Sequence, residues 1–457
     1  MSNKPSLPKG TRDFNPLEMN KRNYVMDTIK VIFRKYGFKQ IETPSMEQLS
    51  VLTGKYGDEG DQLIFKILNS GDYLKATSEK DFLSGSQALS TKVSEKGLRY
   101  DLTVPFARHV VMNQNEINFP FRRFQVQPVW RADRPQKGRY REFYQCDADV
   151  IGTNSIVAEG ELISMALEIL NALNLSAFKF RINNRKILNG IAQYLGQADK
   201  TIELCTSIDK LDKIGTEGVV KELKNHGFKE ESVEKLFPLL NIEGDNYEKL
   251  NALEGQLTKI ENAIQGINEI REALSYCENL KADIKSIYFD PKLARGLGYY
   301  TGCIFEITLD DVKIGSISGG GRYDDLTGVF GLKNISGVGI SFGIDRIIDS
   351  LNELDLFPDD LEQSTFVLVT VFSEEVMPFA LKILSELRSN GIKSEVFPEA
   401  TKMKKQFSYA NNNNIPYVLT IGPEEVKKDT ISLKEMESGK QTSIPQIELI
   451  PTLKQKM

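Results

Sequence analysis

The chain has 457 residues, a formal net charge of −5 at pH 7, and 40% hydrophobic residues. This length predicts two or three folding units, and the ordinary composition excludes disordered and fibrous proteins. The acidic balance excludes a protein coated in positive charge, so contact with a nucleic acid would require a local basic patch.

Targeting signals, membrane spans and metal sites are not expected. The opening MSNKPSLPKGTRDF lacks an apolar core, and no run of about 18 apolar residues occurs. The four cysteines lie far apart without a CxxC pair, and the chain has only two histidines. A structural zinc site or a disulfide framework is therefore not expected, and we predict a cytoplasmic protein.

The first part of the chain predicts helices mixed with antiparallel strands. An apolar stripe predicts a helix over residues 17–36, and residues 98–112 predict a short strand and turn that lead into a second helix. Two strands joined by a basic loop predict a long hairpin over residues 119–150. Residues 156–174 predict an amphipathic helix, and one alternating strand follows it.

The rest of the chain changes character twice. Residues 185–285 are rich in Lys and Glu at helical spacing, which indicates a helical module inserted between two β-rich blocks. Residues 286–345 return to short strands that suit antiparallel pairing. After a polar linker near 355–364, the last ninety residues alternate as βαβαβ, which predicts a small separate α/β domain.

The hairpin gives the strongest indication of chemistry. Between Phe119 and Arg141 it holds seven basic residues and one acid, Asp133. Its loop, from Arg131 to Arg139, can present guanidinium and backbone N–H groups to phosphate oxygens. The alternative is a solvated loop whose arginines pair with surface carboxylates.

One face of the second hairpin strand combines several kinds of polar group. Strand periodicity places on that face Arg141, Phe143, Gln145, Asp147 and Asp149. A cation, an aromatic ring, an amide and two carboxylates can together hold a phosphate, stack a base and bind a cationic amine. The alternative is a strand face that meets only solvent.

Two later clusters point to bound anions or close backbone approach. The segments 295–300 (RGLGYY) and 318–324 (SGGGRYD) contain glycines that allow a ligand to approach the backbone. Neither is a Walker loop or a dinucleotide fingerprint, which argues against P-loop and nicotinamide enzymes. Arg346 lies in the first turn of a predicted helix, where the helix dipole disfavours a cation. This misfit indicates an anionic partner such as phosphate, or a salt bridge with Asp345 or Asp349.

Five segments together resemble the signatures of class II aminoacyl-tRNA synthetases, specifically the histidyl-tRNA synthetase family. They run through nearly the whole chain in the family's order: PKGTRDF, LRYDLTVPFAR, RPQKGRYREFYQCDADVIG, RGLGYYTGCIFE and GGGRYDDL. The resemblance implies an α+β fold, with a class II catalytic domain, an antiparallel sheet flanked by helices, over 1–184 and 286–355. It further implies a helical insertion domain over 185–285 that lies toward the acceptor arm of the RNA, and an anticodon-binding α/β domain over 365–457.

The same resemblance implies an activity, partners and site residues. The activity is ATP-dependent activation of histidine and its transfer to tRNA(His), with Mg²⁺ expected beside ATP, in a homodimer formed through residues 41–47. The implied catalytic residues are Arg131 and Arg295. The implied ATP-binding residues are Arg131, Arg139, Phe143 and Arg346. The implied histidine-binding residues are Asp101, Thr103, Gln145, Asp149, Tyr299 and Tyr300.

Two alternatives and several departures accompany this interpretation. One alternative is a regulatory subunit of ATP phosphoribosyltransferase, which shares the core but typically lacks the anticodon-binding domain; the other is a class II ligase for proline, threonine or glycine. Asp101 and Asp149 stand where one branch of the family has Glu, so their reach is shorter. Asp133 stands where many motif 2 sequences have Glu, and Gly298 replaces a common acid.

Overall fold

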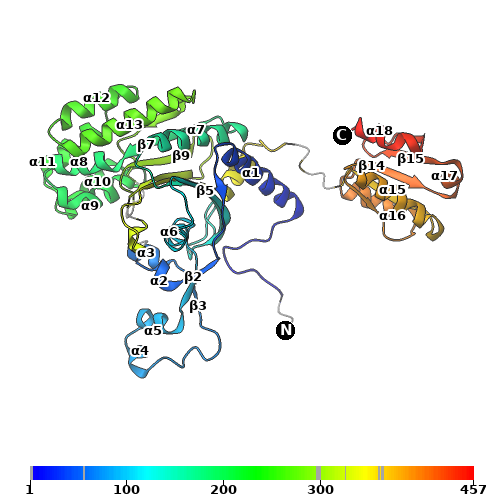
Figure 1. Cartoon of the computed structure of the whole chain (residues 1–457), viewed down its shortest axis with the longest axis horizontal. Helices are drawn as coiled ribbons and strands as arrows, with labels where there is room; N and C mark the ends of the chain where they lie inside the picture. Colours follow the sequence, from blue (N-terminus) through cyan, green and yellow to red (C-terminus); the bar gives the residue numbers. More distant parts are fainter. Residues whose placement is uncertain (1–3, 55–56, 295–299, 325, 359–360, 362–364) are drawn as a thin grey trace. The chain divides into compact units, whose positions relative to one another are not determined.

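The computed structural model describes residues 4–457 except 55–56, 295–299, 325, 359–360 and 362–364. The chain divides into two compact units, residues 1–356 and 357–457. Each unit is built around its own main sheet (Figure 1). Among the helices that the structure describes, none combines the length and apolar character that a bilayer crossing requires.

The first unit contains an eight-stranded sheet in the order β1-β5-β6-β11-β10-β9-β7-β8. Its strands are β1 (Lys39–Gln40), β5 (Phe121–Trp130), β6 (Glu142–Ile151), β7 (Phe178–Asn184), β8 (Ile287–Phe289), β9 (Cys303–Leu309), β10 (Ser316–Tyr323) and β11 (Gly337–Gly343). Neighbouring strands are antiparallel except at the two edges, where β1 pairs with β5 and β8 with β7 in parallel. The predicted hairpin is thus confirmed. Its second strand, β6, pairs with β11, which lies near the C-terminal end of the unit in the sequence.

Helices cover both faces of this sheet. They are α1 (Pro16–Lys35), α6 (Thr103–Met112), α7 (Val157–Ala172) and α14 (Ile344–Glu353). On one face, Phe33 of α1 packs against Phe124 and Phe342, with ring centroids 5.3 and 6.2 Å apart. On the other face, α6 packs against Ile151 and Tyr323. Since alternate residues of a strand face opposite sides, the polar face of β6 lies on the side of α6.

A three-stranded sheet adjoins the start of α6. It consists of β2 (Met46–Gln48), β4 (Lys96–Leu98) and β3 (Lys66–Ile67), with short helices α2 (Leu49–Leu52), α3 (Gly57–Gln62), α4 (Glu79–Leu83) and α5 (Ser86–Val93). Arg99, which follows β4, is buried and donates hydrogen bonds to the carbonyl oxygens of Thr43 and Pro128. This arginine therefore anchors the small sheet to the main one.

Residues 185–286 form the predicted helices, which gather beside β7 and α7 (Figure 1). They are α8 (Arg185–Tyr194), α9 (Thr201–Asp209), α10 (Leu211–Asn225), α11 (Glu230–Leu240), α12 (Asn246–Leu257) and α13 (Glu261–Asn279), with 3₁₀ turns at Ala198–Lys200 and Ile284–Ser286. Glycines let α13 approach closely: a Cβ on Gly160 would stand 2.6 Å from Tyr276 Cβ, and one on Gly190 would stand 2.5 Å from Ala263 Cβ. The helices are confirmed, while their role as a separate domain stays a prediction.

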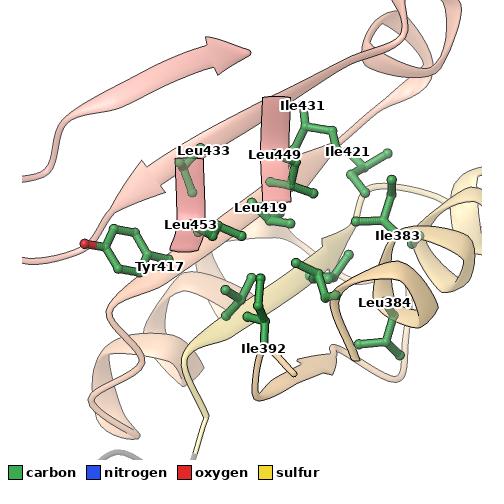
Figure 2. Close-up of a cluster of buried hydrophobic side chains, with 14 of the residues drawn as sticks. Ile383, Leu384, Ile392, Tyr417, Leu419, Ile421, Ile431, Leu433, Leu449 and Leu453 are labelled. Carbon is green, nitrogen blue, oxygen red and sulfur yellow. The ribbon is translucent and has the colours of Figure 1, made fainter. Parts of the chain in front are cut away.

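The second unit contains a five-stranded sheet in the order β13-β12-β14-β15-β16. Its elements are β12 (Val367–Val371), α15 (Met377–Ser389), β13 (Ser394–Val396), α16 (Met403–Asn412), β14 (Tyr417–Ile421), α17 (Pro423–Lys428), β15 (Thr430–Glu435), β16 (Gln441–Pro445) and α18 (Leu449–Lys454). The predicted βαβαβ pattern is confirmed, and two antiparallel strands extend it. Figure 2 shows its core, where Ile383 of α15, Leu419 of β14 and Leu449 of α18 pack together. Among the described residues, further 3₁₀ helices are Gly328–Phe330 in the first unit and Glu374–Val376 and Gln446–Glu448 in the second.

A buried ion pair joins β10 to α7 in the first unit. The Nε and Nη2 atoms of Arg322 donate to the two carboxylate oxygens of Glu159, each at 2.6 Å. Arg322 also donates to Ser336 Oγ and to the carbonyl oxygens of Thr153 and Ser155. Because every guanidinium nitrogen has a partner, the charge is compensated although both side chains are buried.

We predict that Glu159→Gln lowers the free energy of unfolding of the first unit by about 3–5 kcal/mol, because it leaves the buried Arg322 charge uncompensated. Urea denaturation at pH 7 measures this change. The matched control is Glu161→Gln on the same helix, whose partner Arg122 is 31% exposed. The control should cost less than about 1 kcal/mol, and equal losses in both variants would contradict the prediction.

Candidate active site

A pocket lies on the sheet face that α6 covers, and it encloses about 410 Å³ of space including its open mouth. Its lining comes from the start of α6, from the hairpin and from the glycine-rich strands β10 and β11. The lining residues are Asp101, Thr103, Arg131, Gln145, Asp147, Asp149, Tyr300, Gly319, Gly320, Gly321, Tyr323, Gly339, Ile340 and Ser341.

The glycines of the pocket floor are required by close approach. A Cβ on Gly320 would stand 2.1 Å from the carbonyl oxygen of Gly339. A Cβ on Gly339 would stand 2.0 Å from Oδ1 of Asp149, and one on Gly321 would stand 2.9 Å from the ring of Tyr300. The glycine run therefore leaves room for two polar side chains that face the pocket.

Asp149 lies at the base of the pocket in a buried ion pair. Its Oδ2 is 2.7 Å from Nη2 of Arg123, which is opposite it on β5, and its Oδ1 accepts a hydrogen bond of 2.8 Å from the Tyr323 hydroxyl. Burial raises the pKa of Asp149, and the Arg123 charge and the Tyr323 hydrogen bond oppose that rise. The sequence did not single out Arg123 or Tyr323, because only the strand register brings them to Asp149.

Asp147 is a pocket residue that the predicted site omitted, although strand periodicity had placed it on the correct face. Its side chain is buried, and burial, followed by the charges of Asp149 and Asp101, raises its pKa to about 7, while Arg123 and Ser341 oppose the rise. On the same strand face, Gln145 Nε2 donates a hydrogen bond of 2.9 Å to Ser341 Oγ. Among the described residues, no group hydrogen bonds to Asp147 Oδ1 or to Gln145 Oε1, and both atoms are buried.

The start of α6 and the end of β5 supply the remaining wall. Asp101 is buried and accepts a hydrogen bond of 3.1 Å from the backbone N–H of Val104 in the first turn of α6, and Thr103 begins that helix. Arg131 donates to the carbonyl oxygen of Tyr100, and its guanidinium lies 5.2 Å from the ring centroid of Phe143. Tyr300 completes this wall of the pocket.

The other predicted phosphate-binding residues lie at the hairpin loop and not in the pocket lining. Arg346 donates to the carbonyl oxygens of Gly138 in that loop and of Ser316. Arg139 is about half exposed, with its Nη1 3.9 Å from Asp133 Oδ1. The structure brings Arg346 to the loop that carries Arg139, whereas Phe143 lies against Arg131 of the pocket.

The aspartates proposed as alternative partners of Arg346 have other contacts. Asp345 is buried, pairs with Arg12 and Arg22, and accepts a hydrogen bond from the backbone N–H of Tyr144. Asp349 accepts from the Tyr140 hydroxyl at 3.0 Å. Asp345 thus joins α14 to α1, to the N-terminal segment and to β6. The predicted site residues Arg295 and Tyr299 lie outside the described residues.

The pH dependence of stability should report the buried Asp147. A carboxyl group whose pKa is raised on folding binds a proton more tightly in the folded state than in the unfolded state. The stabilisation that this bound proton gives to the folded state is therefore lost as pH rises from about 4 to about 7. At 1.36 kcal/mol per pKa unit, this rise in the pKa of Asp147 corresponds to at most about 4 kcal/mol of folding free energy.

We therefore predict that Asp147→Asn gains stability relative to the unsubstituted protein between pH 4.5 and pH 7, and that the difference is constant above pH 8. Urea denaturation of the ligand-free proteins over this range measures it. A difference that does not change with pH would show that the Asp147 carboxyl titrates alike in the folded and unfolded chains.

Comparisons with known proteins agree over the whole chain. The family model described as "Histidyl-tRNA synthetase" matches residues 90–347, and the model described as "Anticodon binding domain" matches residues 366–456. A histidine–tRNA ligase of Cytophaga hutchinsonii is 53% identical over 450 residues, which cover 98% of this chain and 99% of that protein. One of Bacteroides fragilis is 53% identical over 454 residues, which cover 99% of this chain and 100% of that protein.

The solved structures give the same result for the fold. The crystal structure of histidyl-tRNA synthetase from Nostoc sp. PCC 7120 matches with a TM-score of 0.84 at 31% sequence identity, and the match covers 99% of each chain. The α+β fold with a class II sheet and an appended anticodon-binding domain, predicted by resemblance, is thereby confirmed. The chain belongs to the histidyl-tRNA synthetase family.

Proposed function

We propose that this chain is a histidine–tRNA ligase. It activates L-histidine with ATP to form histidyl-adenylate and pyrophosphate, and then transfers histidine to the 3′ end of tRNA(His). The observation that carries the proposal is the pocket in which Asp149, Gln145 and Arg131 converge. Support comes from relatives 53% identical over almost their full length that are named as histidine–tRNA ligases.

The base of the pocket suits an imidazole ring. Neutral imidazole carries one ring N–H donor and one acceptor nitrogen, and imidazolium carries two donors. Asp149 offers a carboxylate that a ring N–H can reach, and by resemblance Tyr299 and Tyr300 line the same slot. An amino acid without a ring N–H could not donate to this carboxylate, and would lose a hydrogen bond to a charged acceptor that is worth about 1.5–3 kcal/mol. By resemblance, Asp101, Thr103 and Gln145 bind the α-amino group.

The arginines suit the activation step. One oxygen of the histidine carboxylate attacks the α-phosphorus of ATP, the bond to the bridging oxygen breaks, and pyrophosphate leaves. We infer that Arg131 and Arg295 stabilise the charge that develops on the α-phosphate, because fixed cations in a water-poor site stabilise such charge strongly. Phe143 stacks on adenine, while Arg346 and Arg139 bind the phosphates.

Mg²⁺ accompanies ATP in this proposal. In nucleotide sites, Mg²⁺ is held mainly by phosphate oxygens and one or two carboxylates. The basic loop around Arg139 and Arg346 suits a polyphosphate that brings its own metal ion.

The remaining modules suit an RNA substrate. We propose that residues 365–457 bind the anticodon, consistent with the family model that matches 366–456. The helical insertion 185–285 then lies toward the acceptor arm, the catalytic domain comprises 1–184 and 286–355, and the enzyme acts as a cytoplasmic homodimer. Binding through phosphate contacts should weaken as salt concentration rises.

The purified chain should catalyse ATP–pyrophosphate exchange that depends on histidine. Because the pocket recognises its substrate by hydrogen bonds, kcat/KM for histidine should exceed that for proline, threonine or glycine by about 10⁴-fold or more. A panel of the twenty amino acids in the exchange assay measures this ratio.

In the same exchange assay, Arg295→Ala should lower kcat by about 10²- to 10³-fold with little change in the KM for histidine.

The same panel discriminates the alternatives. Comparable exchange with proline, threonine or glycine would overturn the specificity for histidine. Histidine binding without exchange and without loading of tRNA would favour the regulatory subunit of ATP phosphoribosyltransferase.

A further inference from the structure

Two side chains on the pocket face of β6 each carry an acceptor oxygen that has no hydrogen-bond donor among the described residues. The two oxygens are Oε1 of Gln145 and Oδ1 of Asp147, and both atoms are buried. The two residues are separated by one position along the strand, so their Cα atoms lie about 7 Å apart on the same face. A buried acceptor without a donor costs about 1–3 kcal/mol, and more when it is charged. Two such atoms on neighbouring positions of one strand face indicate a place that a ligand donor fills.

Ser341 fixes the orientation of both side chains. It lies opposite Asp147 in the register of β6 and β11, and its Oγ accepts the hydrogen bond from Gln145 Nε2. Its hydroxyl hydrogen is then available to Asp147, with which it also forms a hydrogen bond. Because the amide nitrogen of Gln145 is held by Ser341, the amide oxygen is the end that remains for a ligand.

Two neighbouring polar side chains, Gln125 and Asp149, have partners of their own. Gln125, opposite Asp147 on β5, donates its amide hydrogens to Thr43 Oγ1 and Gln127 Oε1. Asp149 uses one oxygen for Arg123 and the other for Tyr323. Asp147 therefore differs from Asp149 in keeping one carboxylate oxygen without a donor among the described residues.

The ligand group that fits these acceptors is a primary ammonium. It carries a positive charge and three N–H donors, whereas a carboxylate or phosphate would be repelled by Asp147. We propose that Asp147 binds substrate, and that its Oδ1 and Gln145 Oε1 accept hydrogen bonds from the α-ammonium group of the amino acid. This inference rests on the proposed function, because it takes the pocket to be the amino-acid site.

This role gives a physical reason for a buried carboxylate beside two others. Asp101 and Asp149 also line the pocket, and Asp149 is held by Arg123 and Tyr323. Asp147 supplies a third carboxylate between Gln145 and Asp149, and an incoming ammonium group compensates its charge. In the ligand-free protein that charge is costly, since burial favours the protonated form.

A pair of ligands that differ only in the ammonium group tests the proposal. Binding of L-histidine and of 3-(imidazol-4-yl)propionate to the full-length chain is measured by calorimetry at pH 8. Asp147→Asn should weaken histidine binding by about 10- to 100-fold, because it removes a hydrogen bond between charged groups. It should change propionate binding by less than about twofold or strengthen it, because that ligand places no cation beside residue 147.

Two further variants control the experiment. Glu142→Gln removes a carboxylate of the same strand that accepts from Trp130 Nε1, and it should change neither affinity. Asp147→Ser is the second substitution at the site, and it should show the same selective loss if Asp147→Asn folds poorly. Unfolding curves recorded for each variant show which of them are folded.

The outcomes separate the inference from the proposed function. Equal weakening of both ligands in a folded variant, or no weakening of histidine, would overturn the role of Asp147 while histidine-dependent exchange by the unsubstituted chain still supported the function. If exchange instead required another amino acid, the proposed function would fail. The same comparison, made with that amino acid and its deaminated analogue, would then still support or overturn the ammonium site.

Discussion

The ion pair between Arg123 and Asp149 is the interaction on which the pocket depends. Both side chains are buried, and removal of either would leave the other as an uncompensated charge in the centre of the sheet. The Tyr323 hydroxyl holds the second oxygen of Asp149, so the carboxylate has a fixed position. A carboxylate fixed in this way can distinguish ligands by where they place a hydrogen-bond donor.

The fold brings these residues together from distant parts of the sequence. Arg123 comes from β5, Asp149 from β6 and Tyr323 from β10, and β11 lies between the last two strands. Gly339 of β11 has no side chain, and any Cβ there would meet Asp149. The glycine-rich strands therefore serve the pocket by their lack of side chains, while the opposite face of the sheet buries aromatic rings against α1.

Much of this arrangement could be predicted from the sequence. Strand periodicity alone placed Gln145, Asp147 and Asp149 on one face, and the order of elements indicated an antiparallel sheet with a helical insertion and a separate βαβαβ domain. The role of Asp101 came only from the resemblance to a family, because a single residue type at an isolated position carries little chemical information. For Arg131 and Arg346 the sequence alone indicated an anionic partner such as phosphate, and only the resemblance assigned that phosphate to ATP. Those roles remain proposals.

Other features could not be predicted because they depend on long-range register and packing. The contacts of Asp149 with Arg123 and Tyr323 exist only after β5, β6, β11 and β10 have paired in one alignment. Likewise, Asp345 neighbours Arg346 in sequence, yet it pairs with Arg12 and Arg22 from the first thirty residues. Local patterns identify which face a residue occupies, whereas its partners come from strands and helices far away in the chain.

A crystal structure of the chain with histidine and a non-hydrolysable ATP analogue would show where both substrates bind. We predict an imidazole nitrogen within hydrogen-bond distance of the Asp149 carboxylate and the α-phosphate beside Arg131. Histidine bound with its ring away from Asp149, or a nucleotide bound away from Arg131, would contradict it.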